Sequence, residues 1–306
     1  MNQFHEPVLL KEAIEYLKVK PGAKYIDATA GGGGHTFEIL ARGGKVLAID
    51  RDPDAIAHIK NKVKSHFSQE NLLKVSKSKV KNLEDLVLAQ GNFSHIREIA
   101  IKYGFKKVSG ILFDLGVSSH QLQDVKKGFS FQKDSPLDMR MDPSISLKAA
   151  DIINNFDKRR LNEIFENFGQ EKLSRPIIDA ITRARQIKPI GSTWELAQIV
   201  QNVYKKRGVL GKINPATRVF MALRIVVNSE LLNLKDALPF TIDLLAKGGR
   251  LVVISFHSLE DGIVKRFFKQ EERLEIISKT PIGPSRQEIL TNPRSRSAKM
   301  RIAQKI

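Results

Sequence analysis

The chain has 306 residues and a formal net charge of +18, with 51 lysine and arginine residues against 33 acidic ones. A positive field of that size attracts polyanions, so nucleic acid is the expected partner. The chain has no cysteine, which excludes disulfides, zinc–thiolate sites and thiol nucleophiles. No apolar run reaches the roughly 18 residues that a membrane span requires. Acidic residues in the amphipathic N-terminus argue against a signal peptide. We expect a cytoplasmic protein without a membrane partner.

The first part of the chain alternates strands and helices. Helices are expected at 7–17, 36–41, 54–67 and 93–103, and strands at 25–28, 46–50 and 109–114. The polar, lysine-rich stretch 68–92 carries no clear pattern. Alternation of helices with short apolar strands predicts a parallel sheet that is covered on both faces.

Residues 147–206 show helical periodicity with almost no strand signal. Asp157 is expected to cap one helix, and Thr193 another that turns Trp194 and Tyr204 inward. We interpret 129–213 as a small helical domain, inserted into an α/β domain.

The α/β domain comprises residues 1–128 and 214–306. The α/β pattern resumes at Asn214 and Pro215, a helix cap followed by proline at the first helical position. Helices are expected to about residue 232 and then to 246, followed by a strand at 250–256 and a closing pair of strands at 274–279 and 298–304.

Four glycines at 31–34 lie between the first expected strand and its helix. Asp50 ends the next strand about 20 residues later, where a carboxylate can accept both hydroxyls of an adenosine ribose. A dinucleotide fingerprint is absent, because Thr36 or Phe37 stands where the third glycine is needed, and there is no P-loop. S-adenosylmethionine (SAM), which has no phosphate, fits this half-site. A glycine-rich turn in an ordinary α/β protein is the alternative.

Asp114 also ends an expected strand, so it and Asp50 should face the same crevice. There it can orient the cofactor or accept a hydrogen bond from a substrate amine; the alternative is a turn or cap aspartate. His257 follows another strand and is expected at the substrate edge. Arg224 and Asn228 recur on one face of the helix from Asn214, and this polar stripe either lines a cleft or faces solvent.

The motifs along the chain resemble those of the RsmH (MraW) family of bacterial SAM-dependent 16S rRNA cytosine-N4 methyltransferases. The matching segments span essentially the whole chain: 5–12, 31–35, 48–53, 110–119, 128–131, 136–141, 214–218, 255–261 and 292–297. The resemblance implies a Rossmann-like class I SAM-dependent methyltransferase with an inserted helical domain for substrate recognition. The implied partner is 16S rRNA in the small ribosomal subunit, and the implied product is N4-methylcytidine in its decoding region. His120 and Gly262 depart from the residues that the family usually has there.

The resemblance also implies residue roles. The cofactor would contact Gly33, Gly34, His35, Asp50, Phe93, Asp114 and Gln121. Candidates for RNA contact are Arg218, Arg224, Asn228, His257, Arg294 and Arg296. Candidates for accepting the hydrogen bond of the target N4–H are Asp114, Ser118 and Ser119.

No residue is assigned to a metal site, and the sequence leaves open any metal requirement and whether the protein is a monomer or a homodimer. Methylation at carbon 5 of cytosine is excluded because that chemistry requires a cysteine thiolate. A non-catalytic RNA-binding or ribosome-assembly protein on a methyltransferase scaffold is the alternative function.

Overall fold

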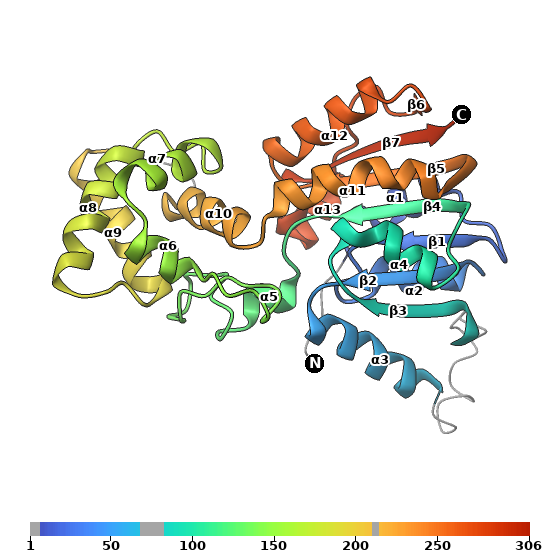
Figure 1. Ribbon diagram of the computed structural model, residues 1–306, viewed down its shortest axis with the longest axis horizontal. Coiled ribbons are helices and arrows are strands. Elements are labelled where there is room, and N and C mark those ends of the chain that lie inside the picture. Colours follow the sequence, from blue (N-terminus) through green and yellow to red (C-terminus); the bar gives the residue numbers. More distant parts are fainter. Residues whose placement is uncertain (1–6, 68–82, 210–213) are drawn as a thin grey trace. The chain divides into compact units, whose positions relative to one another are not determined.

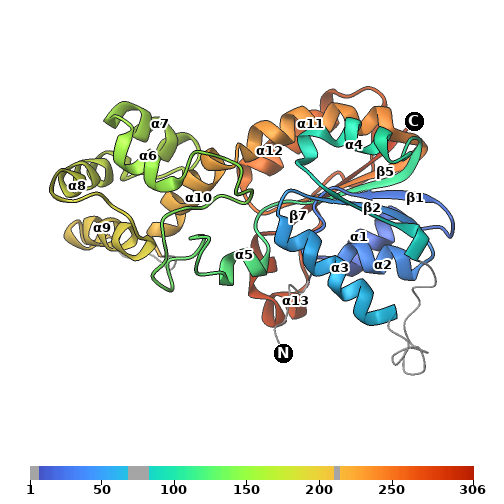
Figure 2. The same ribbon diagram turned by 60° about the horizontal axis from the view of Figure 1, so that its bottom comes forward.

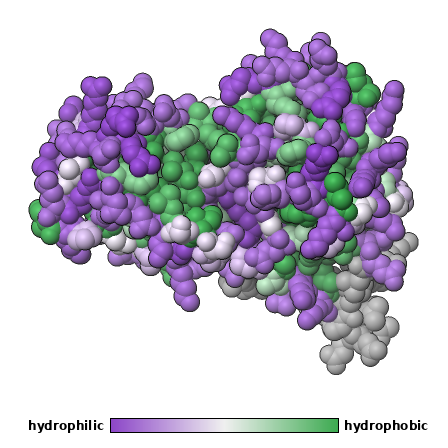
Figure 3. Space-filling view, in the orientation of Figure 1, coloured by the Kyte–Doolittle hydropathy of each residue, from purple (hydrophilic) through white to green (hydrophobic). Residues whose placement is uncertain are grey.

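The computed structural model describes residues 7–67, 83–209 and 214–306. The chain folds into two compact units (Figure 1). The first unit combines Met1–Ser118 with Leu231–Ile306, and the second is Ser119–Glu230. In the view of Figure 3, hydrophilic side chains cover most of the surface of each unit. Within the described ranges, no helix has the length and apolar character needed to cross a membrane.

A seven-stranded sheet forms the centre of the first unit, in the order β3-β2-β1-β4-β5-β7-β6. The five strands from β3 to β5 are parallel, whereas β7 runs antiparallel to both of its neighbours. The strands are β1 (Lys24–Asp27), β2 (Lys45–Asp50), β3 (Leu86–Gln90), β4 (Val108–Asp114), β5 (Leu245–Ser255), β6 (Leu274–Ile276) and β7 (Lys299–Lys305).

Three helices pack against each face of this sheet, as Figure 2 shows. On one side lie α1 (Leu10–Leu17), α2 (Gly34–Ala41) and α3 (Pro53–Phe67), and on the other α4 (Ile96–Lys102), α11 (Glu230–Leu244) and α12 (Ser258–Gln270). In β2, Val46 and Ala48 face the first set while Leu47 and Ile49 face the second. Both faces of the sheet are therefore buried, which explains why residues 46–49 of β2 form an uninterrupted apolar run. The predicted doubly covered parallel sheet is confirmed.

Two strands of the first unit differ from the predictions. Strand β3 was not predicted, because it follows a lysine-rich stretch and is only half buried at the edge of the sheet. Strand β5 begins at Leu245, where a longer helix was expected. Leu245 pairs with Val108 and Arg250 pairs with Gly110, with a register shift between them. The irregularity contains the segment that the sequence indicated as a turn, and Gly248 in that segment has a positive φ of 78°.

The second unit is helical. Its helices are α5 (Ser119–Gln123), α6 (Ala149–Asn155), α7 (Lys158–Asn167), α8 (Ser174–Ile187), α9 (Thr193–Lys206) and α10 (Ala216–Val227). Helix α10 contacts α6, α7 and α9 and buries Val219, Phe220 and Leu223. The unit therefore contains the proposed insert 129–213 and extends beyond it at both ends, because α10 packs with the helical group.

The capping predictions for this unit have mixed outcomes. Asp157 accepts the amide hydrogen of Arg160 at 2.8 Å, which confirms it as the cap of α7. The cap of α9 is Ser192 and not Thr193. Thr193 Oγ1 instead accepts the amide hydrogen of Ser135 at 3.1 Å, inside the unit. The prediction that Trp194 points inward is wrong, since the residue is 55% exposed.

The first unit also contains short helical segments on either side of β3 and near the C-terminus. These are η2 (Leu83–Asp85), η3 (Phe93–His95), α13 (Arg286–Thr291) and η4 (Pro293–Ser297). Because α13 and η4 pack together, the segment before β7 forms a compact corner.

Candidate functional site

Three carboxylates lie at the carboxyl ends of neighbouring parallel strands. Asp27 ends β1, Asp50 ends β2 and Asp114 ends β4. Because β1 pairs with both β2 and β4, the three residues share one edge of the sheet. Ligands of open α/β sheets bind at this edge. The structure thus brings Asp50 and Asp114 to the same side, as expected from the sequence.

The glycine loop that links β1 to α2 presents bare backbone at this edge. Gly31 and Gly33 have positive φ values of 50° and 80°, which side chains rarely adopt. A Cβ at Gly33 would lie 2.7 Å from the Phe37 ring, and one at Gly34 would lie 2.7 Å from the Pro7 ring. Larger residues are therefore excluded from both positions, because protein side chains already fill the space that a Cβ would need.

Asp50 is fixed through both carboxylate oxygens, one of which accepts a hydrogen bond from this loop. Its Oδ2 accepts the amide hydrogen of Gly31 at 2.7 Å, and its Oδ1 accepts that of Asp52 at 2.8 Å. Burial raises the pKa of Asp50 to about 6, against the lowering effect of these hydrogen bonds. Each carboxylate oxygen can accept a further hydrogen bond, so two neighbouring hydroxyls of a ligand are suitable partners.

Asp27 is the site residue that the sequence reasoning missed. It is buried, and its Oδ2 accepts a hydrogen bond from Thr36 Oγ1 at 2.6 Å. Burial raises the pKa of Asp27, while the nearby His35 ring opposes that rise. The available signal was its position near the end of a predicted strand, four residues before the first glycine of the loop.

His35 and Asp114 lie near each other on the same edge. His35 Nδ1 is 3.7 Å from Asp114 Oδ2, and both side chains are largely buried. His35 Nε2 is buried without a hydrogen-bond partner among the described residues. The backbone of Asp114 is fixed by Thr29, whose Oγ1 accepts its amide hydrogen at 2.6 Å. A buried ring nitrogen without a protein partner is typical of a position that a bound ligand satisfies.

Phe93 begins η3, shortly after the carboxyl end of β3. Its ring meets that of Phe113 edge to face, with ring centroids 5.5 Å apart. Asn92 caps this turn by accepting the amide hydrogen of Ser94. The structure thus places Phe93 near strand ends, on a fixed turn. Gln121, which is buried, and Ser119 belong to α5 of the second unit, whereas Ser118 ends the N-terminal part of the first.

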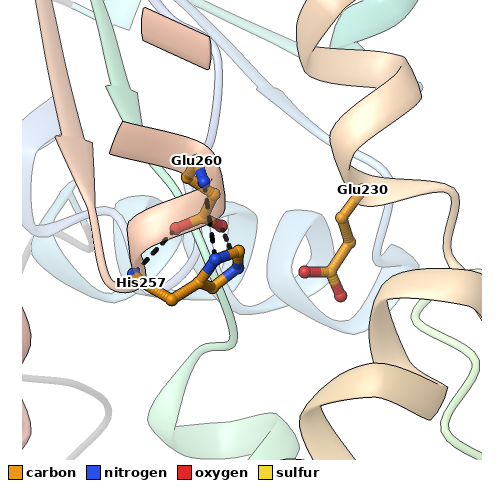
Figure 4. A group of neighbouring side chains, drawn as sticks. All are labelled: Glu230, His257 and Glu260. Atoms are coloured by element: carbon orange, nitrogen blue, oxygen red, sulfur yellow. Dashed lines mark hydrogen bonds and ion pairs between the residues drawn. The ribbon is translucent and has the colours of Figure 1, made fainter. Parts of the chain in front are cut away.

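His257 caps α12 immediately after β5, and Figure 4 shows its ring facing Glu260. Its Nδ1 accepts the amide hydrogen of Glu260 at 3.4 Å, and its Nε2 lies 3.2 Å from Glu260 Oε1. Glu260 Oε2 in turn accepts the amide hydrogen of Phe256 at 2.8 Å. Both ring nitrogens thus face Glu260. This reciprocal capping gives His257 a structural role, which the sequence-based proposal of an RNA contact did not include.

The remaining RNA candidates differ in what surrounds them. In the second unit, Arg224 forms a two-pronged ion pair with Glu230, with both contacts at 2.9 Å. Asn228 is buried, donates to the carbonyl oxygen of Met139 and accepts the amide hydrogen of Met141. These bonds hold the loop before α6. The exposed candidates are Arg218 in the second unit, and Arg294 and Arg296 on η4 of the first.

Taken together, the glycine loop, the strand-end carboxylates and the doubly covered sheet define an α/β enzyme that binds a nucleoside-containing cofactor. The chain belongs to the MraW methylase family, whose model matches residues 2–306. It is a methyltransferase, and SAM is its methyl donor. The predictions of fold class, enzyme class and cofactor are thereby confirmed.

Relatives of similar length support this assignment. The "Ribosomal RNA small subunit methyltransferase H" of Carboxydothermus hydrogenoformans is 41% identical, with 100% of this chain and 99% of the relative covered. The protein of the same name from Persephonella marina is 43% identical, with 99% of each chain covered. Among solved structures, a putative rRNA methylase from Clostridium thermocellum is 14% identical, with a TM-score of 0.45 over 99% of each chain.

Proposed function

We propose that the protein transfers a methyl group from SAM to N4 of a cytidine in the decoding region of 16S rRNA. The observation that carries this proposal is the edge of the sheet where Asp50 and Asp114 lie beside the glycine loop. The names of the relatives favour RNA of the small ribosomal subunit as the substrate. A ribosomal substrate would place the activity in the cytoplasm.

The residues at this edge fit the cofactor. The glycine loop presents backbone without side chains, with positive φ at Gly31 and Gly33, and Asp50 offers acceptors for the ribose hydroxyls. His35 Nε2 is a buried polar atom that a ligand can satisfy. Phe93, Asp114 and Gln121 complete the proposed set. When bound, SAM supplies an electrophilic methyl group on its sulfonium.

The protein's own task is to position the target base and to accept a hydrogen bond from it. Cytosine N4 is a weak nucleophile because its lone pair is delocalised into the ring. In the proposed mechanism the base leaves its stack and enters the site. The carboxylate of Asp114, or the Ser118–Ser119 segment, accepts a hydrogen bond from N4–H as positive charge develops there. Positioning alone contributes effective molarities of about 10⁵ M or more in well-oriented systems.

The absence of cysteine from the sequence favours N4 over carbon 5 as the methylated atom. Methylation at carbon 5 needs a thiolate that adds to the ring, and this chain has none. The exposed Arg218, Arg294 and Arg296 are proposed to contact RNA phosphates, which is consistent with the net charge of +18.

Product analysis tests the proposal directly. Small subunits from a strain that lacks this protein are incubated with the purified enzyme and SAM carrying a labelled methyl group, and the rRNA is digested to nucleosides. We expect label in N4-methylcytidine. Label in 5-methylcytidine, or in no cytidine at all, would overturn the assignment.

An Asp114→Asn variant separates the two roles of that residue. If Asp114 accepts the N4–H hydrogen bond, kcat falls even at saturating SAM. If Asp114 only holds the cofactor, KM for SAM rises while kcat is unchanged. The Asn side chain has nearly the same size, so either result is attributable to the lost charge and not to a cavity.

A further inference from the structure

An unusual backbone conformation occurs where the N-terminal segment enters α1. Leu9 is fully buried, yet it has a left-handed conformation with φ of 52° and ψ of 33°. Residues with a Cβ adopt this conformation at an energetic cost, so the surrounding structure must hold it in place. Leu9 is also the N-cap of α1, and its carbonyl oxygen accepts the amide hydrogen of Ala13 at 2.8 Å. The start of the helix is therefore fixed at a strained residue.

The group that holds Leu9 comes from the other end of the chain. Glu288 Oε1 accepts the Leu9 amide hydrogen at 2.7 Å, across 279 positions of sequence. An amide at a helix N-terminus has no partner within its own helix, so an acceptor from elsewhere must satisfy it when it is buried. Glu288 lies in the first turn of α13, where its own amide is held by Ser285 Oγ at 3.1 Å. The carboxylate is thus presented from a capped helix.

Two residues before Leu9, the chain touches the cofactor loop. The ring of Pro7 lies so close to Gly34 that a Cβ on that glycine would be 2.7 Å from the proline Cγ. Gly34 is the first residue of α2 and follows Gly33, whose φ is 80°. Pro7 therefore packs against the turn whose backbone is proposed to contact the cofactor. Its position depends in turn on how Leu9 is held.

The same C-terminal corner carries candidate RNA contacts. The carbonyl oxygen of Glu288 accepts the amide hydrogen of Asn292 at 2.7 Å, and Asn292 begins the turn into η4 with Arg294 and Arg296. Ser295, in the middle of η4, is fully buried and donates from Oγ to the Asn292 carbonyl oxygen at 2.8 Å. These hydrogen bonds connect the segment that carries the exposed arginines to Leu9.

We propose that Glu288 is a positioning residue for methyl transfer: by holding the Leu9 amide it keeps Pro7 against Gly34, and so fixes the glycine loop in its cofactor-binding form. This inference rests on the proposed cofactor site. Glu288 does not touch the reacting atoms. It links the corner that carries Arg294 and Arg296 to the loop that receives SAM.

Binding of S-adenosylhomocysteine, the product form of the cofactor, tests this without any RNA. Calorimetry on the full chain should show at least about tenfold weaker binding for Glu288→Ala, which removes the acceptor. Glu288→Gln keeps an Oε1 acceptor and should stay within about threefold of wild type. Ser285→Ala is the matched control: it removes the cap of the same helix but leaves the Leu9 hydrogen bond, and should also stay within about threefold.

A second variant changes the contact between Pro7 and Gly34 and leaves Glu288 intact. Pro7→Ala removes the ring that lies against Gly34 and should also weaken binding several-fold. In steady-state assays both Glu288→Ala and Pro7→Ala should raise KM for SAM and leave kcat nearly unchanged. A merely structural role would lower the melting temperature of Glu288→Ala without changing the dissociation constant.

The inference is overturned if Glu288→Ala, or Pro7→Ala where the former does not fold, binds the product as tightly as wild type. This outcome leaves the proposed function intact. Failure of the wild-type protein to bind S-adenosylhomocysteine would instead refute the cofactor site itself. Failure to form N4-methylcytidine would refute the proposed reaction alone.

Discussion

Thr36 Oγ1 donates a hydrogen bond of 2.6 Å to Oδ2 of Asp27, and neither residue is open to solvent. Thr36 lies in the first turn of α2 and Asp27 ends β1, so this bond joins the two elements that enclose the glycine loop. A buried carboxylate needs such donors, because the cost of taking its charge out of water is large.

Thr36→Val should therefore destabilise the protein, by about 2–3 kcal/mol, since it removes a hydrogen bond to a buried carboxylate without leaving a cavity. Thr36→Ser keeps the hydroxyl and is expected to cost less than half as much. Urea unfolding at pH 7 measures both variants. A greater loss for Thr36→Ser than for Thr36→Val would show that the methyl group, and not the hydrogen bond, matters at this position.

The same substitution should have a pH-dependent effect. Burial raises the folded-state pKa of Asp27 above 3.8, so its ionised form opposes folding, and this penalty grows as pH rises from 3.8 through the folded pKa. The Thr36 hydroxyl stabilises the ionised form. Its loss should therefore destabilise the protein increasingly as pH rises above 3.8, and a change of the opposite sign would contradict the proposed pairing.

Cofactor affinity should depend on pH through Asp50. The pKa of this carboxyl is raised to about 6 in the free protein, and hydroxyl donors of the ribose prefer the ionised acceptor. Affinity for S-adenosylhomocysteine should thus be constant above pH 7 and fall by up to about tenfold per pH unit below 6. Calorimetry between pH 5 and 8 measures this profile.

Asp50→Asn provides the control for that profile, because it removes the titrating group. The variant should bind weakly at every pH, and its affinity should change far less between pH 5 and 7. A slope equal to that of wild type would assign the titration to another group of the site.

Much of the first unit follows from sequence patterns. Parallel strands buried on both faces produce apolar runs, so β1, β2 and β4 are recognisable, and each ends in its carboxylate. An edge strand such as β3 lacks this signature because it is only half buried. The glycine loop is also local, which is why Asp50 and the glycines were found together.

The missed features depend on contacts between distant segments. Glu288 reaches Leu9 across 279 residues, and no local pattern contains that hydrogen bond. Asn228 was predicted to lie on a polar stripe, but it is buried because its amide satisfies the backbone of Met139 and Met141. A polar residue on one helix face therefore cannot be assigned to solvent or to a buried loop until the partner of that face is known.

Two glycines of the second unit allow a matched test of packing. Gly128 has a φ of 68°, and a Cβ there would collide with the Pro136 carbonyl oxygen; Gly208 has a φ of 65° and open space around it. Gly128→Ala should cost about 3 kcal/mol, from strain and overpacking together. Gly208→Ala should cost about 1 kcal/mol, from strain alone. Similar shifts in the urea midpoint would contradict this difference in packing.

Trp194 is the only tryptophan of the chain and is 55% exposed, so fluorescence reports on it directly. Its emission should lie close to that of a free tryptophan derivative, and acrylamide should quench it almost as fast. Blue-shifted emission with slow quenching would indicate a buried side chain and would contradict the described orientation of α9.

Substitutions on that helix provide an energetic version of the same test. Trp194→Gln should change the free energy of unfolding by less than about 0.5 kcal/mol, because an exposed side chain loses few contacts. Leu196→Gln, two positions along, should cost about 3 kcal/mol or more, because Leu196 is fully buried and the new amide would lack partners. The reverse order would contradict the described burial of Leu196 and exposure of Trp194.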